Sequence, residues 1–151
     1  MKVNYLRSLM LQIFLGTIIS ATAANTIAAQ DYTAQVRQQL DRLQSALQGR
    51  GYKETHDRKY GRINVSAVES YRVTLRQGWE YVFYGACDED CSDLDIIIYD
   101  SNNNEVAKDN DNSDVPIVRI APNRTGEYHI RVRMYRCSTN PCVYGVGTVG
   151  K

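Results

Sequence analysis

The sequence lacks most of the residues and motifs on which common enzyme families depend. Its 151 residues include only two histidines, His56 and His129, and no G-x-S-x-G, H-E-x-x-H or phosphate-binding glycine motif. These absences argue against serine hydrolases with a nucleophile elbow, zinc peptidases and nucleotide hydrolases. The sequence therefore predicts a protein that is not an enzyme. A small secreted hydrolase that uses His56 or the acidic cluster described below is the alternative.

Long apolar segments are also lacking, apart from one near the N-terminus. Residues 9–19 form an apolar run of about eleven residues, whereas roughly 20 are needed to span a bilayer. Lys2 and Arg7 precede this run and small residues follow it, which is the arrangement of a secretory signal peptide. We predict a signal peptide over residues 1–24, with cleavage as late as residue 29 as an alternative. The expected location is secreted or periplasmic, with no stable membrane insertion after cleavage.

Neither sign of charge is in excess. The chain has 18 lysines and arginines against 17 aspartates and glutamates. Loss of Lys2 and Arg7 with the signal peptide leaves 16 basic against 17 acidic residues, a net charge of −1. A near-neutral protein lacks the global field that attracts nucleic acid. We therefore expect the partner to be an unknown protein, peptide or glycan and not a nucleic acid.

Cysteine is scarce but even in number, which indicates disulfides in an oxidising compartment. Cys87 and Cys91 bracket the turn-like residues DED, and Cys137 and Cys142 bracket STNP. These short brackets favour the local pairs Cys87–Cys91 and Cys137–Cys142. Crossed pairs, which would need the two loops to meet in space, are one alternative. A four-cysteine zinc site, whose spacing zinc also tolerates, is the other.

One segment of the expected mature chain has helical periodicity. Four apolar residues recur there at helical spacing: Val36, Leu40, Leu43 and Leu47. This stripe predicts an amphipathic helix over residues 31–48 that packs on the rest of the domain. A dimer contact through the same stripe is the alternative.

The remainder of the chain has no helical periodicity. Residues 49–68 are polar, and we expect a connector with one short strand. In residues 69–151 apolar positions alternate with polar ones, and turn residues recur about every ten positions. Seven or eight short strands in this pattern predict a mainly β domain, an antiparallel β-sandwich preceded by one α-helix.

Aromatic residues fit both faces of the predicted strands. The alternating runs 71–75 and 79–83 flank Gln77 and Gly78, which predicts a β-hairpin. Five aromatic side chains fit inward-facing positions: Tyr71, Trp79, Tyr81, Phe83 and Tyr128. Three tyrosines fit outward-facing positions, from which they could stack on a sugar or contact a peptide: Tyr84, Tyr99 and Tyr135.

Four stretches of the β part resemble the bacterial pre-peptidase C-terminal domain. They are ESYRVTLRQGWEYVFYG, SDLDIIIYDSNNNEV, KDNDNSD and APNRTGEYHIRV, all within residues 69–149. The resemblance implies a jelly-roll-like sandwich in a stand-alone secreted protein, and some members of that family bind calcium near the corresponding acidic loops. The helix and the four cysteines depart from the commonest form of the family. The resemblance therefore implies a fold more than a role.

Acidic residues are concentrated in one segment. Residues 88–114 hold ten acids against Lys108 alone, a local charge of −9. Charges this dense repel one another unless a cation or arginines lie among them. Carboxylate and amide oxygens suit calcium, so the segment is either a solvated acidic face or a structural calcium site, and we expect no other cofactor. The candidate calcium ligands are Asp93, Asp95, Asp109, Asp111 and Asp114.

Arginines form a second cluster towards the C-terminus. Its members are Arg119, Arg124, Arg131, Arg133 and Arg136, with Glu127 as the one acid among them. If their strand lies beside the acidic one, the two clusters neutralise each other across the sheet. If it does not, the arginines could hold an anionic glycan or the acids of a partner. The candidate ligand face consists of Tyr84, Tyr99, Arg131, Arg133 and Tyr135.

These features favour an exported, non-enzymatic β-sandwich protein that serves as a binding or accessory module. Two alternatives stay open. One is the small secreted hydrolase, and the other is a structural envelope protein that self-associates through the helix stripe.

Overall fold

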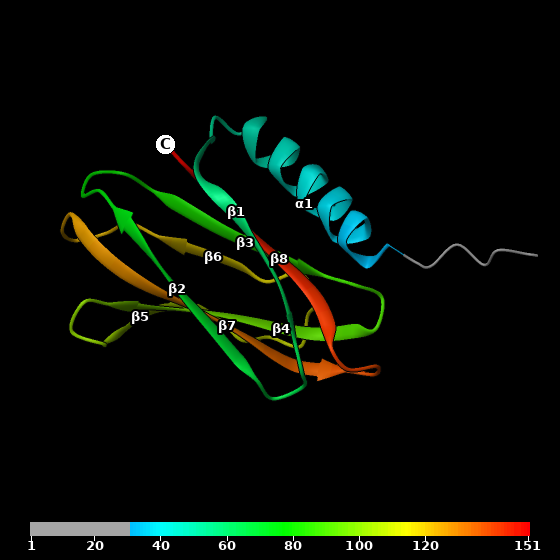
Figure 1. Ribbon diagram of the computed structural model, residues 1–151. Coiled ribbons are helices and arrows are strands. Elements are labelled where there is room, and N and C mark those ends of the chain that lie inside the picture. The colour runs from blue at the N-terminus through cyan, green and yellow to red at the C-terminus, as the bar shows by residue number, and fades with distance from the viewer. Residues whose placement is uncertain (1–30) are drawn as a thin grey trace, which may run out of the picture.

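The computed structural model describes residues 31–151, which form one α-helix and eight β-strands (Figure 1). The predicted signal peptide, residues 1–24, lies outside the described residues. The elements are α1 (Tyr32–Gln48), β1 (Lys53–Ile63), β2 (Val68–Leu75), β3 (Tyr81–Cys87), β4 (Cys91–Asp100), β5 (Glu105–Asp109), β6 (Ile117–Ile120), β7 (Gly126–Cys137) and β8 (Cys142–Gly150).

The strands form two antiparallel four-stranded sheets that enclose one core (Figure 1). Sheet A has the strand order β1-β8-β3-β6, and sheet B has the order β2-β7-β4-β5. This pair of orders is the one produced by the two Greek keys of an eight-stranded jelly roll. The predicted fold class, a mainly β jelly-roll-like sandwich preceded by one amphipathic helix, is therefore confirmed.

The predicted hairpin between residues 71–75 and 79–83 is wrong. Strand β2 pairs with β7 in sheet B, whereas β3 pairs with β8 and β6 in sheet A. The turn itself is present, with Gly78 at a φ of 85°, but it carries the chain from one sheet to the other. Alternation cannot separate these two cases, because both strands bury one face in the same core.

Strand β1 occupies most of the predicted connector, residues 49–68, so that prediction is also wrong. It runs for 11 residues as the edge strand beside β8. Its register slips twice between Glu54 and Lys59, and Ile63 is its one buried residue. Backbone pairing with β8 holds this strand in place. Because that pairing does not depend on side-chain burial, the strand has no clear alternation in its sequence.

Alternate residues of the inner strands fill the space between the sheets. The fully buried apolar side chains of sheet B include Leu75, Leu94, Ile96, Ile98, Ile130, Val132 and Met134. Of the five aromatic residues predicted to point inward, Tyr81, Phe83 and Tyr128 are buried. Tyr71 is half-buried, and Trp79, in the turn before β3, is 38% exposed.

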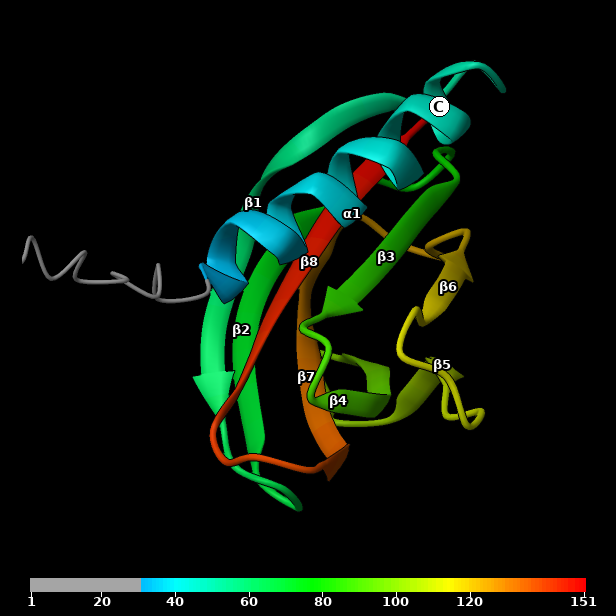
Figure 2. The same cartoon turned by 90° about the vertical axis from the view of Figure 1, so that its right-hand side faces the viewer.

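Helix α1 covers the outer face of sheet A (Figure 2). Asp31 caps its first turn, and Val36, Leu40 and Leu47 are buried in a second core against β3 and β8. Gly145 of β8 allows this close approach, because a Cβ there would lie 2.8 Å from Leu40 Cδ1. The helix stripe therefore packs on its own domain, as predicted, and is not free for self-association.

Polar groups fasten the helix to the sheet. Tyr84 Oη donates a hydrogen bond to Gln44 Oε1 (3.0 Å), and Arg58 Nη1 donates one to Asp41 Oδ1 (2.7 Å). The Tyr84 ring occupies the space that a side chain on Gly147 would need. Tyr84 is fully buried, so its predicted place on an exposed ligand face is wrong. The residue does point away from the core between the sheets, but the helix covers it.

Both predicted disulfides are present, and each joins a strand of sheet A to a strand of sheet B. Cys87 and Cys91 connect β3 with β4, while Cys137 and Cys142 connect β7 with β8. Cys91 and Cys137 are register partners, so the two loops do meet in space, although the pairing stays local. Two disulfides are typical of a protein from an oxidising compartment.

Within residues 31–151, no helix has the length and apolar character that a membrane crossing requires.

Candidate functional site

Within residues 31–151 no helix packs on the outer face of sheet B, and we call this face the open face. Helix α1 packs on β1, β3 and β8, and sheet B lies on the other side of the sandwich (Figure 1). Because alternate residues of β4 and β7 enter the core, the intervening residues point outward. The open face includes Ser70, Arg72, Asp93, Asp95, Ile97, Tyr99, Lys108, His129, Arg131, Arg133 and Tyr135.

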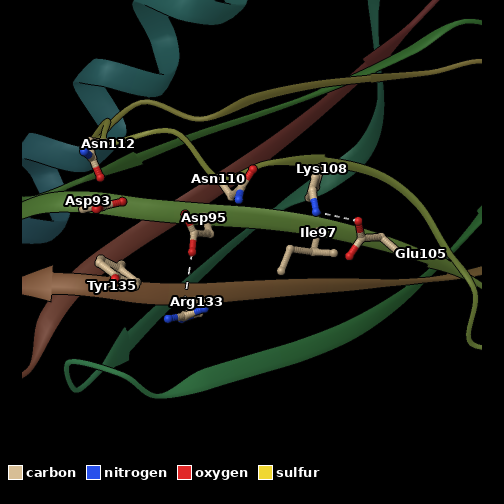
Figure 3. A pocket seen from close by; sticks show the side chains of 9 residues that line it. All are labelled: Asp93, Asp95, Ile97, Glu105, Lys108, Asn110, Asn112, Arg133 and Tyr135. Carbon is tan, nitrogen blue, oxygen red and sulfur yellow. Dashed lines mark ion pairs between the residues drawn. The ribbon is translucent and has the colours of Figure 1, made fainter.

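A pocket of about 320 Å³ lies on the open face, and we call it the polar pocket (Figure 3). Its lining comes from β4, β5, β7 and the loop after β5: Asp93, Asp95, Ile97, Glu105, Lys108, Asn110, Asn112, Arg133 and Tyr135. Lys108 Nζ lies 2.9 Å from Glu105 Oε1, and Ile97 alone among the nine has no polar side-chain atom. This lining suits a ligand rich in hydrogen-bonding groups.

Two carboxylates in the polar pocket are almost fully buried. Asp93 and Asp95 alternate with Leu94, and their exposed fractions are 2% and 4%. The β4–β7 register sets Asp95 opposite Arg133 and Asp93 opposite Arg136, with Oδ2 to Nε distances of 3.9 Å. This distance is an ion-pair contact that is too long for a hydrogen bond. Since no group within residues 31–151 donates a hydrogen bond to either carboxylate, both can still accept from a ligand.

Burial raises the pKa of Asp95 above its ordinary value, and the charge of Asp93 raises it further. Arg133 acts in the opposite direction. A ligand that donates hydrogen bonds to this carboxylate would therefore favour its ionised form. A cavity carboxylate held in this way is typical of a site that binds or transforms a ligand.

Arginines and tyrosines border the two carboxylates. The guanidinium of Arg133 lies 4.6 Å from the ring centroid of Tyr135, which is 44% exposed. Two residues earlier on β7, the guanidinium of Arg131 lies 4.4 Å from the ring centroid of Tyr99. Each arginine is thus held against an aromatic ring, which limits its motion before a ligand arrives.

The predicted calcium ligands fall into two groups. Asp93 and Asp95 line the polar pocket, but Asp109, Asp111 and Asp114 do not. Asp109 instead accepts hydrogen bonds from the backbone N–H groups of Ile117 (2.8 Å) and Asp111 (3.3 Å) and so shapes its own loop. Among residues 31–151, no group of three or more Asp, Glu, His or Cys side chains could hold a metal ion. The choice between a solvated acidic face and a calcium site stays untested, and only Asp93 and Asp95 of the five candidate ligands share a cavity.

Four of the five predicted ligand-face residues do lie together on the open face: Tyr99, Arg131, Arg133 and Tyr135. Tyr84 is the exception, for the reason given above. Of the two alternatives for the arginine cluster, the structure has the one in which its strand lies beside the acidic strand, and two cross-strand ion pairs form, Asp95 with Arg133 and Asp93 with Arg136.

Sequence reasoning missed the part of the pocket that the loop after β5 supplies. Asn110 and Asn112 line the pocket with their amide groups (Figure 3). Their spacing of two in the run DNDNSD was a signal that alternate side chains point to the same side. The backbone N–H of Leu94 donates to the carbonyl of Ser113 (2.9 Å), and this contact holds the loop against β4.

A second hollow of about 340 Å³ lies beside β1, at the turn before β3, and includes His56 and Trp79. His56 Nε2 donates to the carbonyl of Thr74 (3.1 Å), and His56 Nδ1 lies within hydrogen-bond distance of Thr55 Oγ1 (3.0 Å). Both ring nitrogens thus have partners, and the contact with Thr74 joins β1 to β2. No carboxylate within the described residues forms a hydrogen bond with this ring.

No protein-family model matches the chain, and no curated protein matches it either. The resemblance to the pre-peptidase C-terminal domain therefore stays a prediction. The jelly-roll sandwich is observed in the structure.

Proposed function

We propose that the chain is an exported, non-enzymatic β-sandwich module that binds a saccharide in the polar pocket of the open face. One observation carries the proposal. Asp93 and Asp95 are nearly buried, have unused hydrogen-bond acceptors and open into a cavity beside the exposed ring of Tyr135.

Sugar hydroxyl groups match this lining because each one both donates and accepts hydrogen bonds. Asp93 and Asp95 accept, Lys108 and Arg133 donate, and the amides of Asn110 and Asn112 do both. The Tyr135 ring offers an apolar surface for the C–H face of a sugar, with a polar hydroxyl at its edge. An apolar ligand would instead leave seven charged or amide side chains desolvated and unpaired.

Two further observations support the exported and non-enzymatic parts of the proposal. Two disulfides favour an oxidising compartment, in agreement with the predicted signal peptide. A hydrolase would need a nucleophile or water activated by a positioned base. His56 is occupied by two structural hydrogen bonds. A broad hydrolase screen of the wild type, with His56→Ala and Asp95→Ala as controls, tests this part, and activity that either variant loses would replace binding with catalysis.

The test of binding is retention on an immobilised glycan array by the wild type, Asp95→Asn and Tyr135→Ala. We expect the wild type to be retained and both variants to lose at least tenfold in affinity. Asp95→Asn replaces a charged acceptor by an amide, and Tyr135→Ala removes the aromatic surface. Trp79→Ala is the matched aromatic control, since Trp79 is similarly exposed (38% against 44%) but lies in the second hollow. Retention lost in Trp79→Ala and kept in Tyr135→Ala would move the site and contradict the proposal.

A further inference from the structure

A further pocket of about 260 Å³ lies on the open face beside the polar pocket, and its outward side chains are mostly basic. Its lining consists of Ser70, Tyr71, Arg72, His129 and Arg131, and we call it the basic pocket. The β2–β7 register sets Ser70 directly opposite Arg131 and Arg72 directly opposite His129. The four outward side chains therefore form two adjacent cross-strand pairs within one patch.

The basic pocket has more positive charge than its surroundings neutralise. Glu127 is the acid beside it, with Oε1 3.6 Å from Arg72 Nε and 3.3 Å from His129 Nε2. Arg131 forms no ion pair with any of the described residues and stacks on Tyr99 instead. Stacking uses the flat face of the guanidinium, so its N–H edges stay available for an anion. The geometry suits a carboxylate or sulfate group held between Arg131, Arg72 and the hydroxyl of Ser70.

The two pockets are close enough to share one ligand. Arg131 lines the basic pocket and Arg133 lines the polar pocket, and the two residues are successive outward positions on β7. Their Cα atoms are about 7 Å apart, because a strand rises about 3.4 Å per residue. A chain of linked sugar rings can extend along the open face from one pocket to the other.

We propose that the ligand of the open face is an acidic saccharide, whose anionic group binds in the basic pocket while its hydroxyls bind in the polar pocket. This inference rests on the proposed function and adds the ligand class. Charge favours a sugar over an acidic peptide as the occupant. The polar pocket holds three carboxylates against two cations, so it repels further carboxylates but accepts hydroxyl donors.

The test compares uronic-acid polysaccharides with the same polymers after methyl esterification, which removes the charge and keeps the hydroxyls. Hyaluronate, whose acidic rings alternate with neutral ones, is the main probe. Polygalacturonate and alginate, which carry a carboxylate on every ring, are the comparison, and poly-glutamate is the acidic-peptide control. We expect at least one acidic polysaccharide to bind about tenfold or more tightly than its ester, because a charged hydrogen bond is lost. Arg131→Gln should abolish that difference, and Arg131→Lys should restore it in part, since lysine keeps the charge without the planar fork.

Arg119→Gln is the matched control, because it removes the same charge from an exposed position on β6 in sheet A. All variants should keep the wild-type melting temperature. Equal binding of acid and ester, unchanged in Arg131→Gln, would overturn the acidic ligand and leave saccharide binding intact. Binding of poly-glutamate as strong as that of the polysaccharides would overturn the saccharide as the occupant. Binding of no polymer at all would contradict both this inference and the proposed function.

Discussion

The two sheets of the sandwich have the same number of strands but opposite outer faces. Sheet A points Val82, Tyr84, Ala86, Val143 and Val149 outward, and helix α1 buries all of them. Sheet B points charged and aromatic side chains outward, and the described chain leaves that face without a helix. The fold therefore depends on the outer face of sheet A, whereas the open face of sheet B is free to serve binding.

The difference originates in the strands themselves. In β8 every residue is buried, and glycines at positions 145 and 147 leave room for Leu40 and Tyr84. In β7 buried residues alternate with residues that keep contact with solvent, and the latter include Arg131 and Arg133. An arginine covers apolar surface with its stem and keeps its charge in water, so such a face needs no further cover.

The largest expected effect comes from the helix contact. Leu40→Ala should lower the free energy of unfolding by about 2–5 kcal/mol, because it removes a fully buried side chain and leaves a cavity. Ile97→Ala on the open face is the matched comparison and should cause a smaller loss, since Ile97 is only partly buried. Urea unfolding of both variants measures the difference. A larger loss for Ile97→Ala would reverse the roles assigned to the two sheets.

A smaller loss of stability is expected when an added methyl group displaces helix α1 from β8. A Cβ on residue 145 would lie 2.8 Å from Leu40 Cδ1 and 2.9 Å from Val36 Cγ1, so Gly145→Ala should destabilise by about 1–3 kcal/mol. In a Leu40→Ala background the added methyl group has space, and the loss should shrink. A double-mutant cycle measures this coupling. Strict additivity of the two substitutions would contradict direct contact between the helix and β8.

Asp95→Asn should not lower stability, in contrast to the substitutions under the helix. The folded-state pKa of Asp95 is raised above its ordinary value of 3.8, so its ionised form destabilises the fold once the pH exceeds that value. The free energy of unfolding of the wild type should therefore fall relative to that of Asp95→Asn as the pH rises through the folded-state pKa. The two proteins should be equally stable well below pH 3.8. Urea unfolding at about pH 3 and pH 7 tests this sign. A variant that is less stable at pH 7 only would show that the Arg133 pair outweighs burial.

Calcium is expected to have the smallest effect. Only two of the five predicted ligands share a cavity, so chelation should leave the melting temperature of the wild type unchanged. Thermal unfolding with a chelator and with millimolar calcium measures this. A rise with calcium that disappears in Asp93→Asn would establish a cation site at the Asp93–Asp95 pair and revise the ligand assigned to the polar pocket.

Much of this architecture could be predicted from local patterns. The helix could be predicted because the period of its apolar stripe is specific to an α-helix. Strand β7 could be predicted because eight of its residues alternate between core-facing and outward-facing positions. The disulfides followed from the short spacing of the cysteines. The same alternation placed Asp93, Asp95, Arg131 and Arg133 on common faces, which is why most of the ligand face was correct.

The errors all concern relations between distant elements. Alternation predicts on which side of its strand Tyr84 lies, but it does not predict that a helix covers that side. Strand β1 was missed because backbone pairing at a sheet edge leaves no periodic signal in its polar side chains. The false hairpin arose because β2 and β3 follow one another in sequence but lie in opposite sheets.

The open face should bind a ligand although the fold does not require it. An amide chemical-shift map by NMR tests this most directly. The ¹⁵N-labelled protein is titrated with short oligosaccharides from each acidic and esterified polymer. The account predicts shifts centred on Asp95, Arg133 and Tyr135, extending to Arg131 with the acidic sugars, and none on α1 or β8. Shifts centred on α1 or around Trp79, or no shift with any of the sugars, would contradict it.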